Sequence, residues 1–320
     1  MKKIFVNLKR FEVPRRLGGI CSFDNPKKWI EWVLENIVKH GLGKLPNIRV
    51  ICLLPEALII SAIEKLASYP TDEVRNLQVG CQGVFREDIT PGGNFGAFTT
   101  NLPATAAKNL GCTWTIIGHS EERKDKLGII ERYDPSCCHN ERSQAKARQI
   151  VSGIINEEVL CALKAGLNVL LCVGETEEER GYGPFAEQKP RIAAVLRSQL
   201  EMGLQGIEGA IGPQEIVIGY EPVWAIGPGK TPPGKEYISF VSATIKSIVK
   251  EKFNFEPAVV YGGGLKEENA KMIAEIDTID GGLVALTRFT GDIAFEPEGL
   301  KNIIAKYATK KGAVPLCKKS

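Results

Sequence analysis

The sequence predicts an α/β protein built as one closed barrel of eight parallel strands with helices on the outside. Short apolar runs of the kind that form strands buried on both faces alternate with amphipathic stretches of helical length. This strand–helix unit recurs about eight times, and such repetition gives parallel strands joined by right-handed crossovers. Eight units suggest closure into a (β/α)8 barrel, for which about 250 residues are typical.

The apolar and amphipathic stretches set the expected elements in order along the chain. The strands are expected at 4–8, 48–53, 77–82, 113–117, 168–172, 216–220, 258–261 and 282–285. The helices are expected at 26–38, 55–67, 102–110, 157–165, 185–200, 234–250, 267–276 and 296–306.

Two stretches have no place in the repeat. Residues 85–95, with a Pro-Gly-Gly-Asn segment, and the polar residues 124–152 are expected to be insertions in the loop 3 region and after the fourth strand. Neither begins or ends at a sharp change of composition, of the kind that separates domains. Residues 1–320 are therefore predicted to form a single domain.

Composition and charge exclude some classes of function. A net charge of +3 gives no strong basic field, so neither nucleic acid nor a membrane surface is expected as a partner, whereas a small anionic substrate is compatible. No apolar stretch reaches the ~20 residues of a membrane span. The nine cysteines have no regular spacing and read as thiols in a reducing compartment, which predicts a cytoplasmic protein.

Glu221 is the first candidate catalytic residue. It ends the apolar run 216–220, and Pro222 keeps its backbone extended, so the side chain points off the strand end. The Gly-rich segment 222–231, which contains Trp224, is expected to close over this carboxylate as a lid and to raise its basicity by desolvation.

Other polar residues follow other strands. Asn7 and Lys9 come at the end of the first, and His119 follows the fourth. Because the carboxyl ends of parallel barrel strands meet on one rim, a carboxylate, an imidazole and a lysine are expected there together. Such a set can move a proton between adjacent carbons.

These motifs resemble those of the triosephosphate isomerase family over nearly the whole chain. The matching segments are Asn7-Leu-Lys9, Gly96-Ala-Phe-Thr99, Gly118-His-Ser-Glu121, Tyr220-Glu-Pro-Val-Trp-Ala-Ile-Gly227, Tyr261-Gly-Gly263 and Asp280-Gly281. Each segment alone is weak evidence, but their order along a barrel pattern is specific. The resemblance implies a TIM barrel and an aldose–ketose isomerase that interconverts dihydroxyacetone phosphate and glyceraldehyde 3-phosphate.

The resemblance also implies the roles of the residues. Glu221 is expected to be the base and a neutral His119 to polarise the substrate oxygens, with Ser120 capping a short helix whose dipole favours the neutral imidazole. Lys9 supplies positive charge, Asn7 positions it, and Glu121 orders Lys9. The family needs no metal or organic cofactor. Cys137-Cys138-His139 lacks the spacing of a zinc site.

Departures from the family pattern gather where the phosphate is expected to bind, which is formed by Gly227, Gly264 and the segment after the eighth strand. Gly264 stands in place of a serine, and Ala285-Leu286 stand in place of a Gly-Gly pair that lets the backbone approach the anion. Thr287 and Arg288 could supply replacement contacts. These changes leave open a longer substrate, such as a tetrulose phosphate.

Further departures lie elsewhere: Glu122 for an arginine, Asn101 for an acid and Pro232 at the far end of the lid. The third-loop motif, residues 96–99, implies a homodimer. A third reading, a barrel that has lost turnover and serves as a scaffold, is disfavoured because Asn7, Lys9, His119, Glu121 and Glu221 are all present.

Overall fold

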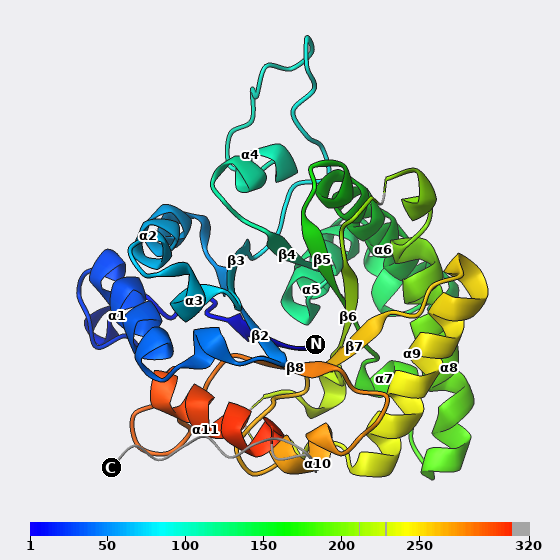
Figure 1. Ribbon diagram of the computed structural model, residues 1–320. Coiled ribbons are helices and arrows are strands. Elements are labelled where there is room, and N and C mark those ends of the chain that lie inside the picture. The colour runs from blue at the N-terminus through cyan, green and yellow to red at the C-terminus, as the bar shows by residue number, and fades with distance from the viewer. Residues whose placement is uncertain (211, 228, 309–320) are drawn as a thin grey trace.

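Eight parallel strands pair in chain order, and the eighth pairs with the first to close the barrel. The structure is a computed structural model that describes residues 1–210, 212–227 and 229–308, and Figure 1 shows the strands ringed by helices. The strands are β1 (Lys2–Asn7), β2 (Ile48–Leu54), β3 (Leu77–Cys81), β4 (Trp114–Ile117), β5 (Asn168–Val173), β6 (Ile216–Tyr220), β7 (Ala258–Tyr261) and β8 (Gly281–Val284). The predicted barrel is confirmed, with strand ends that differ by no more than two residues.

The strands are apolar throughout because their side chains enter two separate cores. One set fills the barrel interior, where Phe5 meets Trp114 edge-on with ring centroids 5.1 Å apart. The Trp114 indole N–H donates to Gln78 at 2.7 Å, so its polar atom is satisfied inside the barrel. The alternate set packs outward against the helices in a larger core. Burial on both faces explains why the strands read as continuous apolar runs.

The helices form the outer layer. The α-helices are α1 (Pro26–Lys39), α2 (Glu56–Ala67), α3 (Thr71–Val74), α4 (Ala104–Asn109), α5 (Ser120–Tyr133), α6 (Glu141–Lys164), α7 (Glu177–Arg180), α8 (Phe185–Gly203), α9 (Lys235–Phe253), α10 (Ala270–Ala274) and α11 (Pro297–Ala308). Short 3-10 turns are η1 (Arg15–Leu17), η2 (Leu42–Lys44), η3 (Pro135–Cys138), η4 (Ile207–Gly209) and η5 (Val223–Ala225). All eight predicted helices are present in whole or in part.

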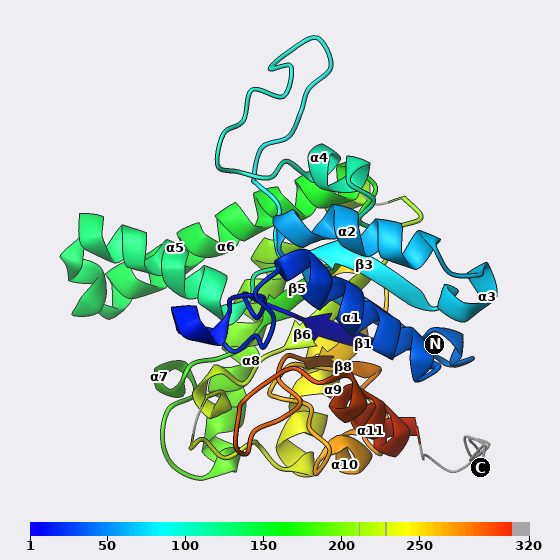
Figure 2. The same cartoon turned by 90° about the vertical axis from the view of Figure 1, so that its left-hand side faces the viewer.

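The segment 124–152 is where the predicted elements were incomplete. It is not a structureless insertion: α5 enters it, η3 turns the chain, and α6 leaves it as one helix that runs through the predicted helix 157–165. Asn140 begins α6 by accepting a hydrogen bond from Ser143 N at 3.0 Å. Figure 2 shows α5 and α6 side by side, projecting from the barrel. We call residues 120–164 the α5–α6 hairpin.

Two loops at the carboxyl ends of strands are also long. Residues 82–103, between β3 and α4, project from the barrel in both views (Figures 1 and 2), and Phe95 on this loop is 86% exposed. After β8, the chain turns back on itself through an antiparallel bridge between Arg288 and Ala294. Asp292 in this turn pairs with Arg15 at 2.7 Å, which ties the loop after β8 to the loop after β1.

Candidate active site

The first part of the site is formed by the end of β1. Asn7 is the last residue of the strand and is 6% exposed, and its Oδ1 accepts the Lys9 backbone N–H at 3.1 Å. Lys9 has a left-handed backbone with φ of +43°, an uncommon conformation for a residue other than glycine. This turn directs the Lys9 side chain across the rim to Glu121, where Nζ lies 2.6 Å from Oε1.

Gln82 supports this turn from the neighbouring strand. It directly follows β3, and its Nε2 contacts Asn7 Oδ1 at 3.2 Å, Lys9 O at 3.1 Å and Leu53 O at 3.2 Å. Sequence reasoning assigned Gln82 only to the third strand. Gln82 is polar and stands at the carboxyl end of that strand, where barrel enzymes place their site residues, and this position could have identified it.

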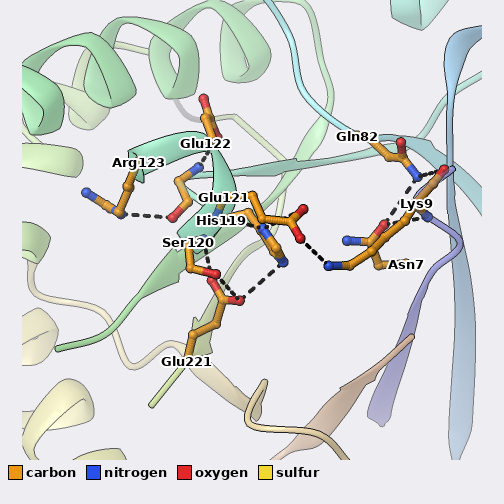
Figure 3. A network of polar contacts seen from close by, with 10 residues as sticks. Asn7, Lys9, Gln82, His119, Ser120, Glu121, Glu122, Arg123 and Glu221 are labelled. Carbon is orange, nitrogen blue, oxygen red and sulfur yellow. Dashed lines mark hydrogen bonds and ion pairs between the residues drawn. The ribbon is translucent and has the colours of Figure 1, made fainter. Parts of the chain in front are cut away.

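The loop after β4 contributes the imidazole. His119 is the N-cap of α5, and its Nδ1 accepts the Glu121 backbone N–H at 3.2 Å. Because Nδ1 is an acceptor, the neutral imidazole carries its proton on Nε2. That proton faces Glu221, with Nε2 3.3 Å from Oε1 (Figure 3).

The prediction that Ser120 caps a short helix was wrong. The N-cap is His119, and the helix runs for 14 residues because the segment after it is helical. Ser120 is instead the first helical residue, and its free backbone N–H donates to Glu221 Oε2 at 3.0 Å while its Oγ lies 3.3 Å from Oε1.

Glu221 lies directly after β6 and is 3% exposed. Its backbone N–H donates to Val173 O at 2.8 Å, which continues the pairing of β5 with β6. The chain at Gly174 passes so close that a Cβ there would lie 1.7 Å from Glu221 O, so this position requires glycine. Beneath the carboxylate, burial and the Glu221 charge raise the pKa of the Cys172 thiol well above its usual range, so the thiol stays neutral.

The carboxylate of Glu121 is held by Lys9. Desolvation opposes its ionisation, but the hydrogen bond and charge of Lys9 outweigh it and hold the pKa of Glu121 below its usual range. Lys9 and Glu121 therefore remain an ion pair at neutral pH, at the edge of the site opposite Glu221 in Figure 3.

The start of the predicted lid is anchored by a buried acid. Glu175, in the loop after β5, is fully buried and accepts hydrogen bonds at Oε1 from Tyr220 OH (2.9 Å), Trp224 Nε1 (2.8 Å) and Tyr237 OH (2.7 Å). Trp224 lies within η5 and stacks under the Arg180 guanidinium at 3.9 Å. Pro228, within the predicted lid 222–231, lies outside the described residues.

Only some of the residues predicted to hold the phosphate line the cavity. Gly264 and Ala285 line the same cavity as His119 and Glu221, whereas Gly227, Leu286, Thr287 and Arg288 are not on its wall.

The side chains of Thr287 and Arg288 are engaged within their own loop. Thr287 Oγ1 donates to Glu296 O at 2.9 Å and accepts from Glu296 N at 2.6 Å. Arg288 pairs with the Glu296 carboxylate at 3.2 Å. No periodic pattern of residues predicts this turn after β8.

The cavity has a volume of about 710 Å³ and extends well beyond the reacting groups. From Asn7, Lys9, His119 and Glu221 it continues along the inner side of the α5–α6 hairpin, past Leu127 and Val151, to α8. Within the part of the chain that the structure describes, no group of three or more His, Cys, Asp or Glu side chains is placed to hold a metal ion. The site thus brings together a carboxylate, an imidazole N–H and an ammonium group.

A closed parallel barrel with acid–base groups at the carboxyl ends of its strands is the arrangement used by barrel enzymes. The family model for triosephosphate isomerase matches residues 33–292. The chain belongs to the triosephosphate isomerase family, a family of isomerases.

Individual relatives agree with this assignment. The chain is 30% identical over 270 residues to the triosephosphate isomerase of Oleidesulfovibrio alaskensis, which covers 82% of this chain and 88% of that protein. It is 35% identical over 212 residues to that of Chloroherpeton thalassium, covering 65% of this chain and 69% of that one. The crystal structure of triosephosphate isomerase from Bartonella henselae superposes with a TM-score of 0.64 at 22% identity, over 96% of this chain and 98% of that chain, and shows the same fold.

Proposed function

We propose that this protein interconverts dihydroxyacetone phosphate and glyceraldehyde 3-phosphate, as an enzyme of triose metabolism in glycolysis and gluconeogenesis. The observation that supports the proposal is the convergence of Glu221, the Nε2 proton of His119 and the Lys9 cation on one rim. The proposal includes a cytoplasmic location. None of the helices in the described residues is both long and apolar enough to span a membrane.

The reaction needs one base and one donor. Glu221 takes a proton from the carbon next to the carbonyl, and the electron pair left behind forms an enediolate. The Nε2 proton of His119 stabilises the enediolate oxygens and can move between them. Protonated Glu221 then returns the proton to the neighbouring carbon. Lys9 stabilises the negative charge, and Asn7 and Gln82 keep the Lys9 turn in place.

The test is the rate of a Glu221→Asp variant in a coupled assay with either triose phosphate. Shortening the side chain withdraws the carboxylate by about an ångström, so kcat should fall by about 10² to 10³-fold. Glu64→Asp, an exposed glutamate on α2, is the matched control and should keep the parent rate. Equal rates for Glu221→Asp and its parent would remove Glu221 as the base, and a parent without turnover would favour the scaffold reading.

A second candidate substrate is a longer sugar phosphate, such as a tetrulose phosphate. The volume of about 710 Å³ favours it, because cavities of that size enclose ligands much larger than a triose phosphate. Ala285 lies on the cavity wall where the family has a glycine. Its side chain limits how closely a phosphate can approach the backbone at the end of β8. Comparison of kcat/KM for triose and four-carbon sugar phosphates decides between them: a higher value for a four-carbon substrate would make that compound the substrate.

A further inference from the structure

A cluster of partly buried ionisable side chains lies next to the turn that carries His119, and its members are not on the cavity wall. It consists of Glu122 and Lys126 on α5 and Glu158 on α6. Lys126 contacts the carboxyl groups of both glutamates, at 2.8 Å from Glu158 Oε1, and Glu158 is 5% exposed. The triosephosphate isomerase reaction gives these three residues no role.

One carboxylate oxygen of this cluster accepts a hydrogen bond from the backbone of the residue before His119. Glu122 Oε2 accepts the Gly118 N–H at 2.6 Å. The carbonyl of the same glycine accepts the Arg123 Nε–H at 2.8 Å, so both polar groups of Gly118 are held by side chains from the first turn of α5 (Figure 3). The contact is similar to a capping box, in which an acid at the third helical position reaches back to the backbone before the helix.

Gly118 is also the residue on which the direction of His119 depends. Its φ is +74°, and a Cβ there would lie 2.9 Å from both Arg123 Nη2 and Cys172 O. The chain therefore turns out of β4 through a left-handed residue with no spare space. A small rotation of this turn would swing His119, whose Nε2 lies 3.3 Å from Glu221.

The charges of the cluster fix Glu122 in the state that accepts a hydrogen bond. Burial and the neighbouring Glu122 carboxylate raise the pKa of Glu158 to about 9. Burial works against Glu122 as well, but the hydrogen bond from Glu158 and the charge of Lys126 hold its pKa below the usual range. One carboxylate, one carboxylic acid and one ammonium then give a neutral cluster at neutral pH.

We propose that Glu122 is a positioning residue, which sets the Gly118–His119 turn and so the direction of the His119 imidazole, and that the α5–α6 hairpin anchors it through Lys126 and Glu158. The inference rests on the proposed isomerase function for its kinetic readout. It gives a task to the inserted segment, which supplies Lys126, and it explains how a glutamate functions at a position where the family has an arginine.

The test compares Glu122→Ala with Glu122→Gln. Alanine removes the acceptor of the Gly118 N–H, and kcat should fall about 10-fold or more with KM changed less than about 2-fold, because imidazole direction and not substrate binding is disturbed. Glutamine keeps an acceptor oxygen of the same reach and should recover most of kcat. Glu131→Ala, farther along α5, is the matched control and should keep the parent kcat.

A second measurement keeps the proposal testable without turnover. The ¹⁵N resonances of His119 should report a neutral imidazole protonated at Nε2 in the parent, and a mixture of tautomers in Glu122→Ala. Lys126→Met, which leaves Glu122 in place but unanchored, should give a smaller change in the same direction, and it replaces Glu122→Ala if that variant does not fold.

The kinetic and spectroscopic results separate the two ideas. If the parent isomerises no triose phosphate but the His119 resonances are as expected, the proposed function is wrong. The positioning role of Glu122 would still stand. A kcat for Glu122→Ala within about 2-fold of the parent, with unchanged His119 resonances, would overturn the positioning role alone.

Discussion

Trp224 Nε1 donates a 2.8 Å hydrogen bond to Oε1 of Glu175, and this contact joins the first turn of the predicted lid to the loop after β5. The same oxygen also accepts from Tyr220 and Tyr237, whereas the other oxygen, Oε2, has no hydrogen-bond partner among the described residues. Burial raises the pKa of Glu175, although the donated hydrogen bonds oppose the shift. The segment predicted to form the lid thus begins at a residue that a buried hydrogen bond holds in place.

Removal of the indole N–H should weaken this anchor. Trp224→Phe keeps an aromatic ring under Arg180 but removes one donor to a buried acid, so the free energy of unfolding should fall by about 1–3 kcal/mol. Urea denaturation measures it. Trp32→Phe is the matched control, since the Trp32 indole N–H has no partner among the described residues. An equal loss in both variants would mean that ring size, not the hydrogen bond, sets the effect.

Removal of the Lys9 charge should affect the reaction and not the fold. In Lys9→Met the enediolate loses its nearby cation, and kcat/KM should fall by about 10²-fold or more. Lys28→Met, on the exposed side of α1, should retain the parent kcat/KM. A variant that keeps more than half of the parent value would show that Lys9 serves only to pair with Glu121.

The protonated Glu158 makes stability depend on pH. Its folded pKa of about 9 exceeds the ordinary value of 4.5, so the folded state binds a proton that the unfolded state releases. This contribution to stability is complete below about pH 4.5 and is lost as the pH rises toward 9. Relative to Glu158→Gln, which does not titrate, the parent should therefore lose stability between pH 5 and pH 9. Parallel stability curves for the two proteins would contradict a proton on Glu158.

The projecting loop 82–103 predicts a dimer that depends on Phe95. This side chain is 86% exposed within a long loop that includes residues 96–99, from which the resemblance predicts a homodimer, and a second subunit would bury it. We expect the parent to sediment as a dimer and Phe95→Asp to shift toward monomer. Ile129→Asp, at an apolar residue of α5 that is 61% exposed, should sediment like the parent. A monomeric parent would remove the proposal.

The barrel was predictable from the sequence because burial on both faces leaves a continuous apolar run. The strands 216–220 and 258–261 were predicted with the bounds that the structure has. The α5–α6 hairpin was not, because a helix that projects from the body buries only part of one face and its apolar period is weak. Within 124–152, Ala147 and Val151 are the two apolar side chains of α6 that are buried.

Site residues that belong to a sequence motif could be predicted. Residues that reach the site only through a tertiary contact could not. Glu221, His119, Lys9, Asn7 and Glu121 lie together as the motifs indicated. Gln82 and Glu175 come from other loops, and only the closure of the barrel brings them near. The contact of Thr287 with Glu296 depends on the turn after β8. No pattern of residues in the sequence predicts the geometry of that turn.

The left-handed backbone of Lys9 sets stability against activity at one position. A non-glycine residue there is strained by about 1–2 kcal/mol, and glycine would relieve most of it. A screen that rewards heat resistance would therefore accept Lys9→Gly as an improvement, while a screen that rewards turnover would reject it. The two screens should disagree at this position, and the disagreement would mark a residue that is kept for its charge.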